Sequence, residues 1–146
     1  MAGAIPRSEH AGGHLVDALD RAGHRLTGPR RQVAELVAGR DGHFTAADLV
    51  DEARDLGIGR ATLFRSIALF TSLGPVEPVD LPGGEHAYVA CETAHHHHAI
   101  CTSCGRSFDV DDGGLSTVLA RIGSRSGFRV TAHRLEIFGL CAACQG

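Results

Sequence analysis

The sequence predicts a mixed α/β (α+β) protein with two small domains, and three observations support this prediction. Of the 146 residues, 43% are hydrophobic and 21% charged, a composition that can bury a core. Helical periodicity fills the first half, whereas strand-like alternation begins only at Val76. All five Cys and six of the ten His lie in residues 77–146. We place the domains at residues 1–82 and 83–146, divided within a Pro- and Gly-rich segment.

The composition also excludes several classes of protein. The chain contains no run of about 20 apolar residues, so we expect no membrane partner. The first 13 residues lack the apolar core of a secretory signal, which predicts a cytoplasmic location. Residues 1–12 are small and polar, and we expect them to be disordered. The net charge is −3, and all 14 basic residues are Arg.

Four helices are predicted before residue 76. Apolar residues at helical spacing predict the first helix at residues 15–22. The second begins at Thr27-Gly-Pro-Arg30, because Pro suits the first turn of a helix. The third follows Thr45-Ala-Ala-Asp48, a capping box with Asp in place of Glu. The fourth runs from residue 60 to residue 73 and stops at Gly74-Pro75.

The fourth helix has two unlike faces. At 100° per residue, one face is apolar and faces the core; it carries Leu63, Ile67, Phe70 and Leu73. The opposite face carries two Ala and Arg65, with Phe64 beside it, and could fit closely against a ligand.

Two alternating segments, residues 76–80 and 86–90, then predict a β-hairpin. Helices followed by a hairpin are the element order of a winged helix-turn-helix, a DNA-binding module. The alternative is a small helical domain with a surface Arg. The candidate DNA-binding residues are Arg30, Arg60, Thr62, Phe64 and Arg65.

Two CxxC pairs predict a structural zinc site in the second half. Cys101 and Cys104 form one pair, and Cys141 and Cys144 form the other. Two such pairs complete a tetrahedral four-thiolate site for zinc. A redox dithiol, the alternative, usually shows one CxxC rather than two. The 36 residues between the pairs require the fold to bring them together.

Four consecutive His precede the first CxxC pair. The apolar residues that follow predict that His95–His98 belong to a strand, whose side chains alternate between two faces. His95 and His97 then face one way, and His96 and His98 the other, so the strand predicts two metal sites rather than one. A solvated His run without a metal is the alternative. The possible further ligands are Glu77, Asp80, Glu85, His86, Cys91, Asp109, Asp111, Asp112, His133, His24 and His43.

The rest of the second half predicts a small α/β unit. Strands are expected at the His run, at residues 107–111 and at residues 128–138, with a helix around residues 115–122 before the last strand. The resulting β-β-α-β order forms a sheet that could pair with a second copy, which suggests a homodimer.

These motifs resemble the ferric uptake regulator family, most closely its zinc uptake branch. The resemblance covers about residues 13–146; it is carried by Thr27–Arg30, Ala61–Arg65, His95–Gly105 and His133–Cys144. It implies a winged helix fused to an α/β dimerisation domain. It also implies a homodimer that binds palindromic DNA operators when a metal fills a regulatory site, usually as a repressor of uptake genes.

The resemblance also assigns ligands to three metal sites. Cys101, Cys104, Cys141 and Cys144 correspond to the structural zinc site, and Glu77, Cys91, His96 and His98 to a regulatory site at the hinge. His43 is the alternative fourth regulatory ligand. A further site would contain His95, His97 and His133. Its usual Glu is replaced by Ser116, so water, Asp111 or Asp112 would have to substitute.

The chain departs from the family in the fourth helix, and its regulatory site has a distinctive ligand. Phe64 stands where the family usually has Tyr; a Phe ring can still pack on a thymine methyl but loses the hydroxyl contact. Pro75 replaces an aliphatic residue at the start of the wing. Cys91 adds a thiolate to the regulatory site, which favours zinc over iron or manganese. A sensor of iron, nickel or peroxide remains the alternative within the family.

Two other classes of zinc protein fit the sequence less well. A zinc hydrolase or deaminase would need a general base, but neither His-Glu-x-x-His nor His-x-Glu with Pro-Cys-x-x-Cys is present. We therefore expect no enzyme activity and no small-molecule substrate. A zinc storage or transfer protein would need no DNA-binding helix. The prediction is a zinc-responsive repressor with one structural zinc, one regulatory zinc and a possible third per subunit.

Overall fold

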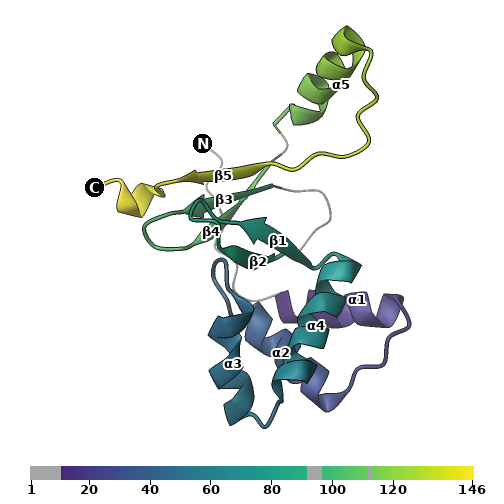
Figure 1. Ribbon diagram of the computed structural model, residues 1–146, viewed down its shortest axis with the longest axis vertical. Helices are drawn as coiled ribbons and strands as arrows, with labels where there is room; N and C mark the ends of the chain where they lie inside the picture. The colour runs from purple at the N-terminus through teal and green to yellow at the C-terminus, as the bar shows by residue number, and fades with distance from the viewer. Residues whose placement is uncertain (1–10, 92–96, 112) are drawn as a thin grey trace.

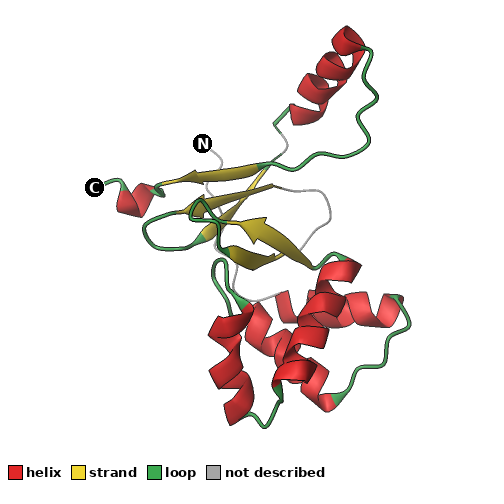
Figure 2. Cartoon of the chain, in the orientation of Figure 1, coloured by secondary structure: helices red, strands yellow, loops and turns green. Residues whose placement is uncertain are grey.

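The computed structural model describes residues 11–91, 97–111 and 113–146. It contains a group of helices, a hairpin and a second sheet with a projecting helix (Figures 1 and 2). The helices are α1 (Ala11–Arg21), α2 (Gly28–Ala38), α3 (Ala46–Asp55), α4 (Arg60–Leu73), α5 (Leu115–Ser126) and the short 3-10 helix η1 (Ala142–Cys144). The strands are β1 (Val76–Asp80), β2 (His86–Ala90), β3 (His97–Cys101), β4 (Ser107–Val110) and β5 (Glu136–Gly139). This mixed α+β architecture confirms the predicted fold class.

Helices α2, α3 and α4 begin where their sequence signals predict, whereas α1 begins four residues earlier than the predicted Leu15. Thr27 caps α2 and Pro29 lies in its first turn. Gly74 adopts a left-handed conformation, with φ of 100°, immediately after α4. Helix α1 begins at Ala11, so it includes the last two of the twelve terminal residues expected to be disordered. The first ten of them lie outside the described residues.

Helix α4 packs against α1, α2, α3 and β1, at the centre of the helical group. Leu63, Ile67 and Phe70 are buried, and Leu73 packs partly buried against the same core. Arg65 and the two Ala residues on the opposite side of the helix are exposed. The predicted core face of the fourth helix is therefore confirmed.

Helix α3 begins at a complete capping box. The Thr45 hydroxyl accepts a hydrogen bond from the Asp48 backbone N–H at 3.2 Å, and the Asp48 carboxylate accepts one from the Thr45 N–H at 2.7 Å. The bond from the Thr45 N–H lowers the pKa of Asp48 below its ordinary 3.8 and outweighs the opposing effect of burial. The stabilisation from this carboxylate is present above pH 3.8 and is lost as the pH falls through its lowered pKa.

We expect Thr45→Ala to lower the free energy of unfolding by about 1 kcal/mol, because the substitution removes an N-cap hydroxyl. Urea unfolding at neutral pH measures the change. Thr45→Ser is the control, since serine keeps the hydroxyl and should lie within about 0.5 kcal/mol of the parent protein. A Thr45→Ala protein as stable as the Ser variant would contradict the role of the box.

The hairpin of β1 and β2 links two hydrophobic cores. The strands pair antiparallel from Val76–Ala90 to Asp80–His86, as predicted. Val76 and Ala90 belong to the core of the helical group. Val79 and Val89 pack instead with Ile100 of β3. The hairpin therefore lies between the helices and the second sheet and contacts both.

The second sheet has the strand order β4-β3-β5. Strand β3 pairs antiparallel with β4 and parallel with β5, so the β-β-α-β order is confirmed. The predicted strand over residues 128–138 is wrong in its first part, because β5 begins at Glu136. Among the described strands, none pairs with residues 128–135. Their alternation is real, but a strand also needs a neighbour that accepts its backbone hydrogen bonds. His133 consequently lies in the connection between α5 and β5.

Helix α5 projects away from the rest of the molecule (Figure 1). None of its residues is buried, although Val118 and Ile122 are apolar and about half exposed. Phe128 just after the helix is 68% exposed, and Ile137 and Leu140 at β5 are also exposed. This single chain therefore leaves several large apolar side chains open to water on α5 and near β5.

No helix in the described ranges is both long and apolar enough to span a bilayer.

Candidate functional site

The four predicted zinc-binding cysteines lie together. Their Sγ atoms are all within 4.8 Å of one another, although the two CxxC pairs are far apart in sequence. The parallel pairing of β3 with β5 brings them together, because Cys101 ends β3 and is paired with Gly139. Cys104 and Cys141 have their sulfur atoms 3.8 Å apart. Zn–S bonds of about 2.3 Å in a tetrahedron place sulfur atoms about 3.8 Å apart, so the cluster has the right size for zinc.

The electrostatics of this cluster also suit a cation. Backbone N–H groups of Cys141 and Cys104 donate to the Cys101 sulfur and lower the pKa of its thiol to about 6. For Cys144, a hydrogen bond with Ser103 lowers the pKa, but the neighbouring sulfurs of Cys141 and Cys104 outweigh it and raise the pKa to about 11. The four sulfurs therefore cannot all ionise at neutral pH without a positive charge between them.

A second cluster lies where the hairpin meets β3. Its members are Glu77 on β1, Cys91 immediately after β2 and His98 on β3. The His98 Nε2 atom is 3.2 Å from the Cys91 Sγ and 3.3 Å from a carboxylate oxygen of Glu77. Cys91 and His98 are only 4% and 3% exposed. The hairpin and β3 thus supply a buried thiol, a buried imidazole and a carboxylate that is 40% exposed.

The other nitrogen of His98 is held by a carboxylate. The Nδ1 atom lies 3.5 Å from a carboxylate oxygen of Asp109, which is the cross-strand partner of His98 on β4. Burial lowers the pKa of His98, but Asp109, Cys91 and Glu77 together outweigh it and raise the pKa to about 11. A carboxylate on the second nitrogen is the usual partner of a metal-binding His, because it fixes the tautomer and the ring orientation.

The donor set of the second cluster suits zinc. Zinc accepts Cys, His and carboxylate ligands, and bonds of about 2.0 to 2.3 Å separate ligand atoms by about 3.3 to 3.8 Å in a tetrahedron. The separations from His98 Nε2 to its two neighbours are of this size. Binding a metal there would displace the proton that His98 otherwise retains.

Only some of the predicted metal ligands lie within the described residues, so the structure shows only for these which of them lie together. His96, predicted as a ligand beside His98, and His95, predicted beside His97, lie outside the described residues. His43, the alternative source of a fourth regulatory ligand, does not belong to the Glu77, Cys91 and His98 group. Its ring lies against Gly105 near the four cysteines.

His97 faces away from the second cluster, as the strand alternation predicts. Its Nε2 atom is 3.4 Å from the Nε2 atom of His133, and the two ring centroids are 5.2 Å apart. Among the described residues, no acidic group completes a three-ligand set with this pair. Ser116, which replaces the usual Glu, lies in the first turn of the exposed helix α5.

The predicted DNA-binding residues present a mixed surface on α4. Arg60, Phe64 and Arg65 are exposed, whereas Thr62 is half-buried. The Phe64 ring is 44% exposed, and the Arg60 guanidinium lies 5.6 Å from its centroid. Arg30 is half-buried and donates a hydrogen bond to the Arg25 carbonyl. The first three therefore form one exposed surface that combines positive charge with an aromatic ring.

Sequence reasoning did not single out two structural features. Asp109 was one of many possible ligands, and only the antiparallel pairing of β3 with β4 places it opposite His98. The contact between the α2–α3 loop and the first CxxC turn was not predicted at all. Its residues, Gly42 and Arg106, carry no motif that sequence alone could have detected.

Comparisons with known proteins match nearly the whole chain. The sequence model of the ferric uptake regulator family matches residues 21–138. A ferric uptake regulation protein of Klebsiella pneumoniae is 34% identical over 128 residues, which are 86% of this chain and 83% of that protein. A zinc uptake regulation protein of Mycobacterium tuberculosis is 34% identical over 129 residues, 87% of this chain and 99% of that protein.

Solved structures match the fold as well. A structure described as a zinc uptake regulator complexed with zinc and DNA superposes with a TM-score of 0.76 and 26% identity. The match covers 94% of this chain and 97% of that one. Similarity therefore extends through both the helical group and the cysteine-containing half.

Proposed function

Because the chain belongs to the ferric uptake regulator family of metal-responsive transcription regulators, we propose that it is a zinc-responsive DNA-binding repressor of metal uptake genes. One observation carries the choice of zinc: the Cys91 thiol lies 3.2 Å from His98, and both side chains are buried. A thiolate beside an imidazole favours zinc, whereas oxygen-rich sites favour iron or manganese.

We assign the regulatory site to Glu77, Cys91 and His98, with His96 as the proposed fourth ligand. Glu77 belongs to the first proposed domain, whereas Cys91, His96 and His98 belong to the second. A metal held by all of them ties the hairpin to the second sheet. Metal binding thereby restricts the orientation of the helical group relative to that sheet, and DNA binding and zinc binding strengthen each other.

The remaining metal sites follow the same assignment. Cys101, Cys104, Cys141 and Cys144 would hold the structural zinc. The close pair of His97 and His133 would supply two ligands of a third site, with His95 as another. Zinc bound by two or three imidazoles needs water or an acidic side chain to complete four ligands.

The exposed surface of α4 is the proposed DNA-reading face. Arg60 and Arg65 can contact phosphates or guanine edges, and Phe64 can pack on a thymine methyl. Two further residues are proposed to support this contact: Arg30 from the first turn of α2, and Thr62 from α4 itself. The structure described as a zinc uptake regulator with zinc and DNA supports this assignment.

We propose that the protein acts as a homodimer. A second copy would cover the apolar surface of α5, Phe128 and β5, which this chain exposes. Strand β5 lies at the edge of its sheet and offers unpaired backbone groups to a partner strand. Two helical groups related by a two-fold axis would read a palindromic operator. A regulator of this kind acts in the cytoplasm, where it meets DNA.

Selection from a randomised duplex pool, with free zinc buffered high or low, tests this function. We expect a palindrome to be enriched only at high zinc. Arg65→Ala should weaken binding to that palindrome about 10- to 100-fold, because it removes a charged contact from the reading face. Arg54→Ala is the matched control; this exposed Arg lies on α3 and pairs with Asp51.

Other results would redirect the assignment. Enrichment of a palindrome with iron or nickel instead of zinc would overturn the choice of metal and leave the family function in place. A failure to enrich any sequence with any metal would overturn the DNA-binding assignment and favour zinc storage or transfer.

A further inference from the structure

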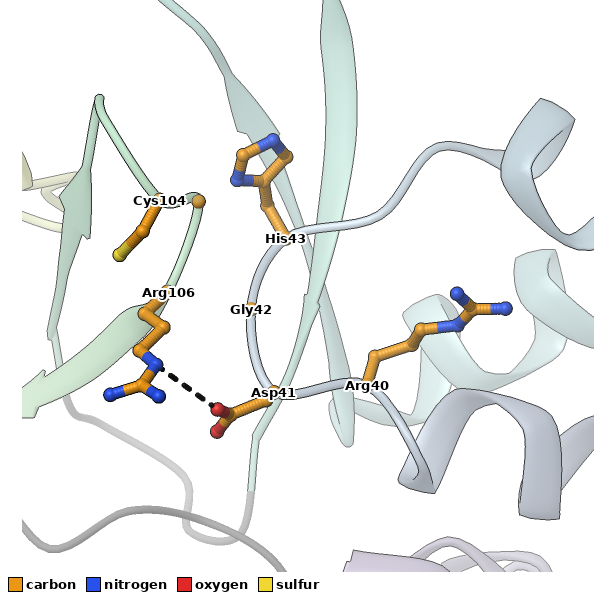
Figure 3. A pocket seen from close by; sticks show the side chains of 7 residues that line it. Arg40, Asp41, Gly42, His43, Cys104 and Arg106 are labelled. Atoms are coloured by element: carbon orange, nitrogen blue, oxygen red, sulfur yellow. Dashed lines mark ion pairs between the residues drawn. The ribbon is translucent and has the colours of Figure 1, made fainter.

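The turn between Cys101 and Arg106 contacts the helical group directly. This CxxC turn closes through two backbone hydrogen bonds, from Gly105 N–H to the Cys101 carbonyl and from Cys101 N–H to the Arg106 carbonyl, both 2.9 Å long. Its far side meets the loop of residues 40–44, which joins α2 to α3. Figure 3 shows this loop facing Cys104 and Arg106 across a shared hollow.

Backbone atoms make the central contact. Gly42 and Arg106 form an antiparallel β-bridge, and the Ser107 N–H donates to the Asp41 carbonyl at 3.4 Å. On the other side of the loop, Phe44 forms a second bridge with Tyr88 of the hairpin. The loop is therefore held at two places, by the hairpin and by the CxxC turn.

Gly42 permits the close approach. A Cβ atom at this position would collide with the carbonyl oxygen of Gly105 and would lie 3.2 Å from the Arg106 Cα. Both are backbone atoms, which cannot move aside without displacing the turn. The contact therefore depends on the absence of a side chain at residue 42.

Side chains on both sides of the bridge add to the contact. The Arg106 guanidinium pairs with the Asp41 carboxylate at 3.5 Å (Figure 3). Both groups are about half exposed, so the pair adds little energy but favours one orientation. His43 packs its ring beside Gly105, and it lines the same hollow as Cys104 (Figure 3).

From these contacts we infer that Gly42 and Arg106 position the DNA-binding helices by docking the α2–α3 loop onto the structural-zinc turn. This inference rests on the proposed function and adds a second connection to it, separate from the regulatory cluster. The four-cysteine site then does more than hold its own domain together. It shapes the turn on which the loop docks, and this loop leads directly into the capped start of α3.

The docked loop constrains the reading face through short connections. Helix α3 begins two residues after Phe44, and α3 packs against α4, which carries Phe64 and Arg65. The regulatory cluster fixes the hairpin, and the docked loop, which is bridged to the hairpin at Tyr88, adds a separate contact with the CxxC turn. Two connections define an orientation more closely than one, because a single hinge leaves rotation about itself free.

Operator binding by Gly42→Ala at saturating zinc is the principal test. We expect operator affinity to fall about tenfold, a coupling of ordinary size, while each subunit keeps the same number of bound zinc ions. Gly39→Ala is the matched control, since Gly39 ends α2 with a φ of −72° and has no contact as close. An unchanged affinity in a folded, fully zinc-loaded Gly42→Ala protein would overturn the inference.

A charge reversal keeps the inference testable if Gly42→Ala does not fold. Arg106→Glu places two carboxylates at the contact and should weaken operator binding about two- to threefold, the scale of an exposed ion pair. Asp41→Arg combined with Arg106→Glu should restore the affinity, and Arg106→Lys should leave it nearly unchanged. Equal losses in the single and double variants would overturn the role of the pair.

Amide hydrogen exchange separates this inference from the proposed function, because it requires no DNA. In the zinc-loaded protein, Gly42→Ala should accelerate exchange in peptides covering residues 40–48 and 104–110, whereas Gly39→Ala should not affect the second peptide. Faster exchange in a protein that binds no operator would refute the proposed function and support the docked loop. Unchanged exchange at Ser107 would refute the docked loop even if operator binding is zinc-dependent.

Discussion

Cys91→Ser should abolish the zinc response of operator binding. At saturating zinc, we expect the affinity of the variant to fall about 100-fold, to the level of the parent protein without regulatory zinc. Serine keeps the size of the side chain but does not supply the thiolate that zinc prefers. The loss leaves His98 and Glu77 as the described ligands, fewer than zinc requires. Fluorescence anisotropy of a labelled operator, titrated at buffered zinc concentrations, measures the change.

The Cys91→Ser protein should lose the zinc response of operator binding but keep its fold and its structural zinc. Because Cys91 does not belong to the four-cysteine cluster, the zinc held there and the far-UV circular dichroism should be retained. His86→Ala provides the control, since this exposed His lies on the same hairpin and pairs with Asp80 instead of a cluster residue. A Cys91→Ser protein with the parental zinc response would refute the assignment of the regulatory site.

Removal of the structural zinc should have a larger effect on the fold. We expect Cys141→Ser to unfold the second sheet and to eliminate operator binding at every zinc concentration. Structural zinc sites supply about 10 to 16 kcal/mol, which equals or exceeds the whole stability of a typical small domain. The second sheet shares only a small core with the hairpin, centred on Val79, Val89 and Ile100, so it cannot compensate for this loss.

Circular dichroism and zinc analysis distinguish this outcome from that of Cys91→Ser. The helical signal of α1–α4 should remain in part, since their hydrophobic core includes none of the four cysteines. The strand signal should be lost, and prolonged treatment of the parent protein with a strong chelator should reproduce the effect. A cooperatively folded second sheet in the zinc-free variant would show that the four cysteines are dispensable for folding.

Local sequence signals predicted the first half of the fold well. Helix α4, both strands of the hairpin and the capping box at Thr45 have their determinants within a few neighbouring residues. The pairing of residues 128–135 could not be predicted in the same way. Alternation at Phe128 and beyond is a local property, but the presence of a neighbouring strand depends on the whole fold, and here only the end of the segment pairs with β3.

The candidate sites likewise contain some residues that local sequence could predict and others that it could not. Spacing alone identified the four cysteines, and the period of a strand predicted that His97 and His98 would face different partners. The contributions of Asp109 and Gly42 could not be predicted, because each depends on a contact between segments far apart in sequence. The proximity of Glu77 to His98 likewise depends on the tertiary fold: a Glu77 carboxylate oxygen lies 3.3 Å from the His98 Nε2 atom, and His43 does not belong to this group.

Adjacent positions on β3 carry the proposed ligands of two separate sites, since His97 faces His133 and His98 faces Cys91. This arrangement affects which genetic changes the protein can tolerate during evolution. A substitution at either His alters one site and spares the other. Insertion or deletion of one residue within the strand exchanges the two faces and disrupts both sites in a single event. Related sequences should therefore vary in the composition of either site far more freely than in the length of this strand.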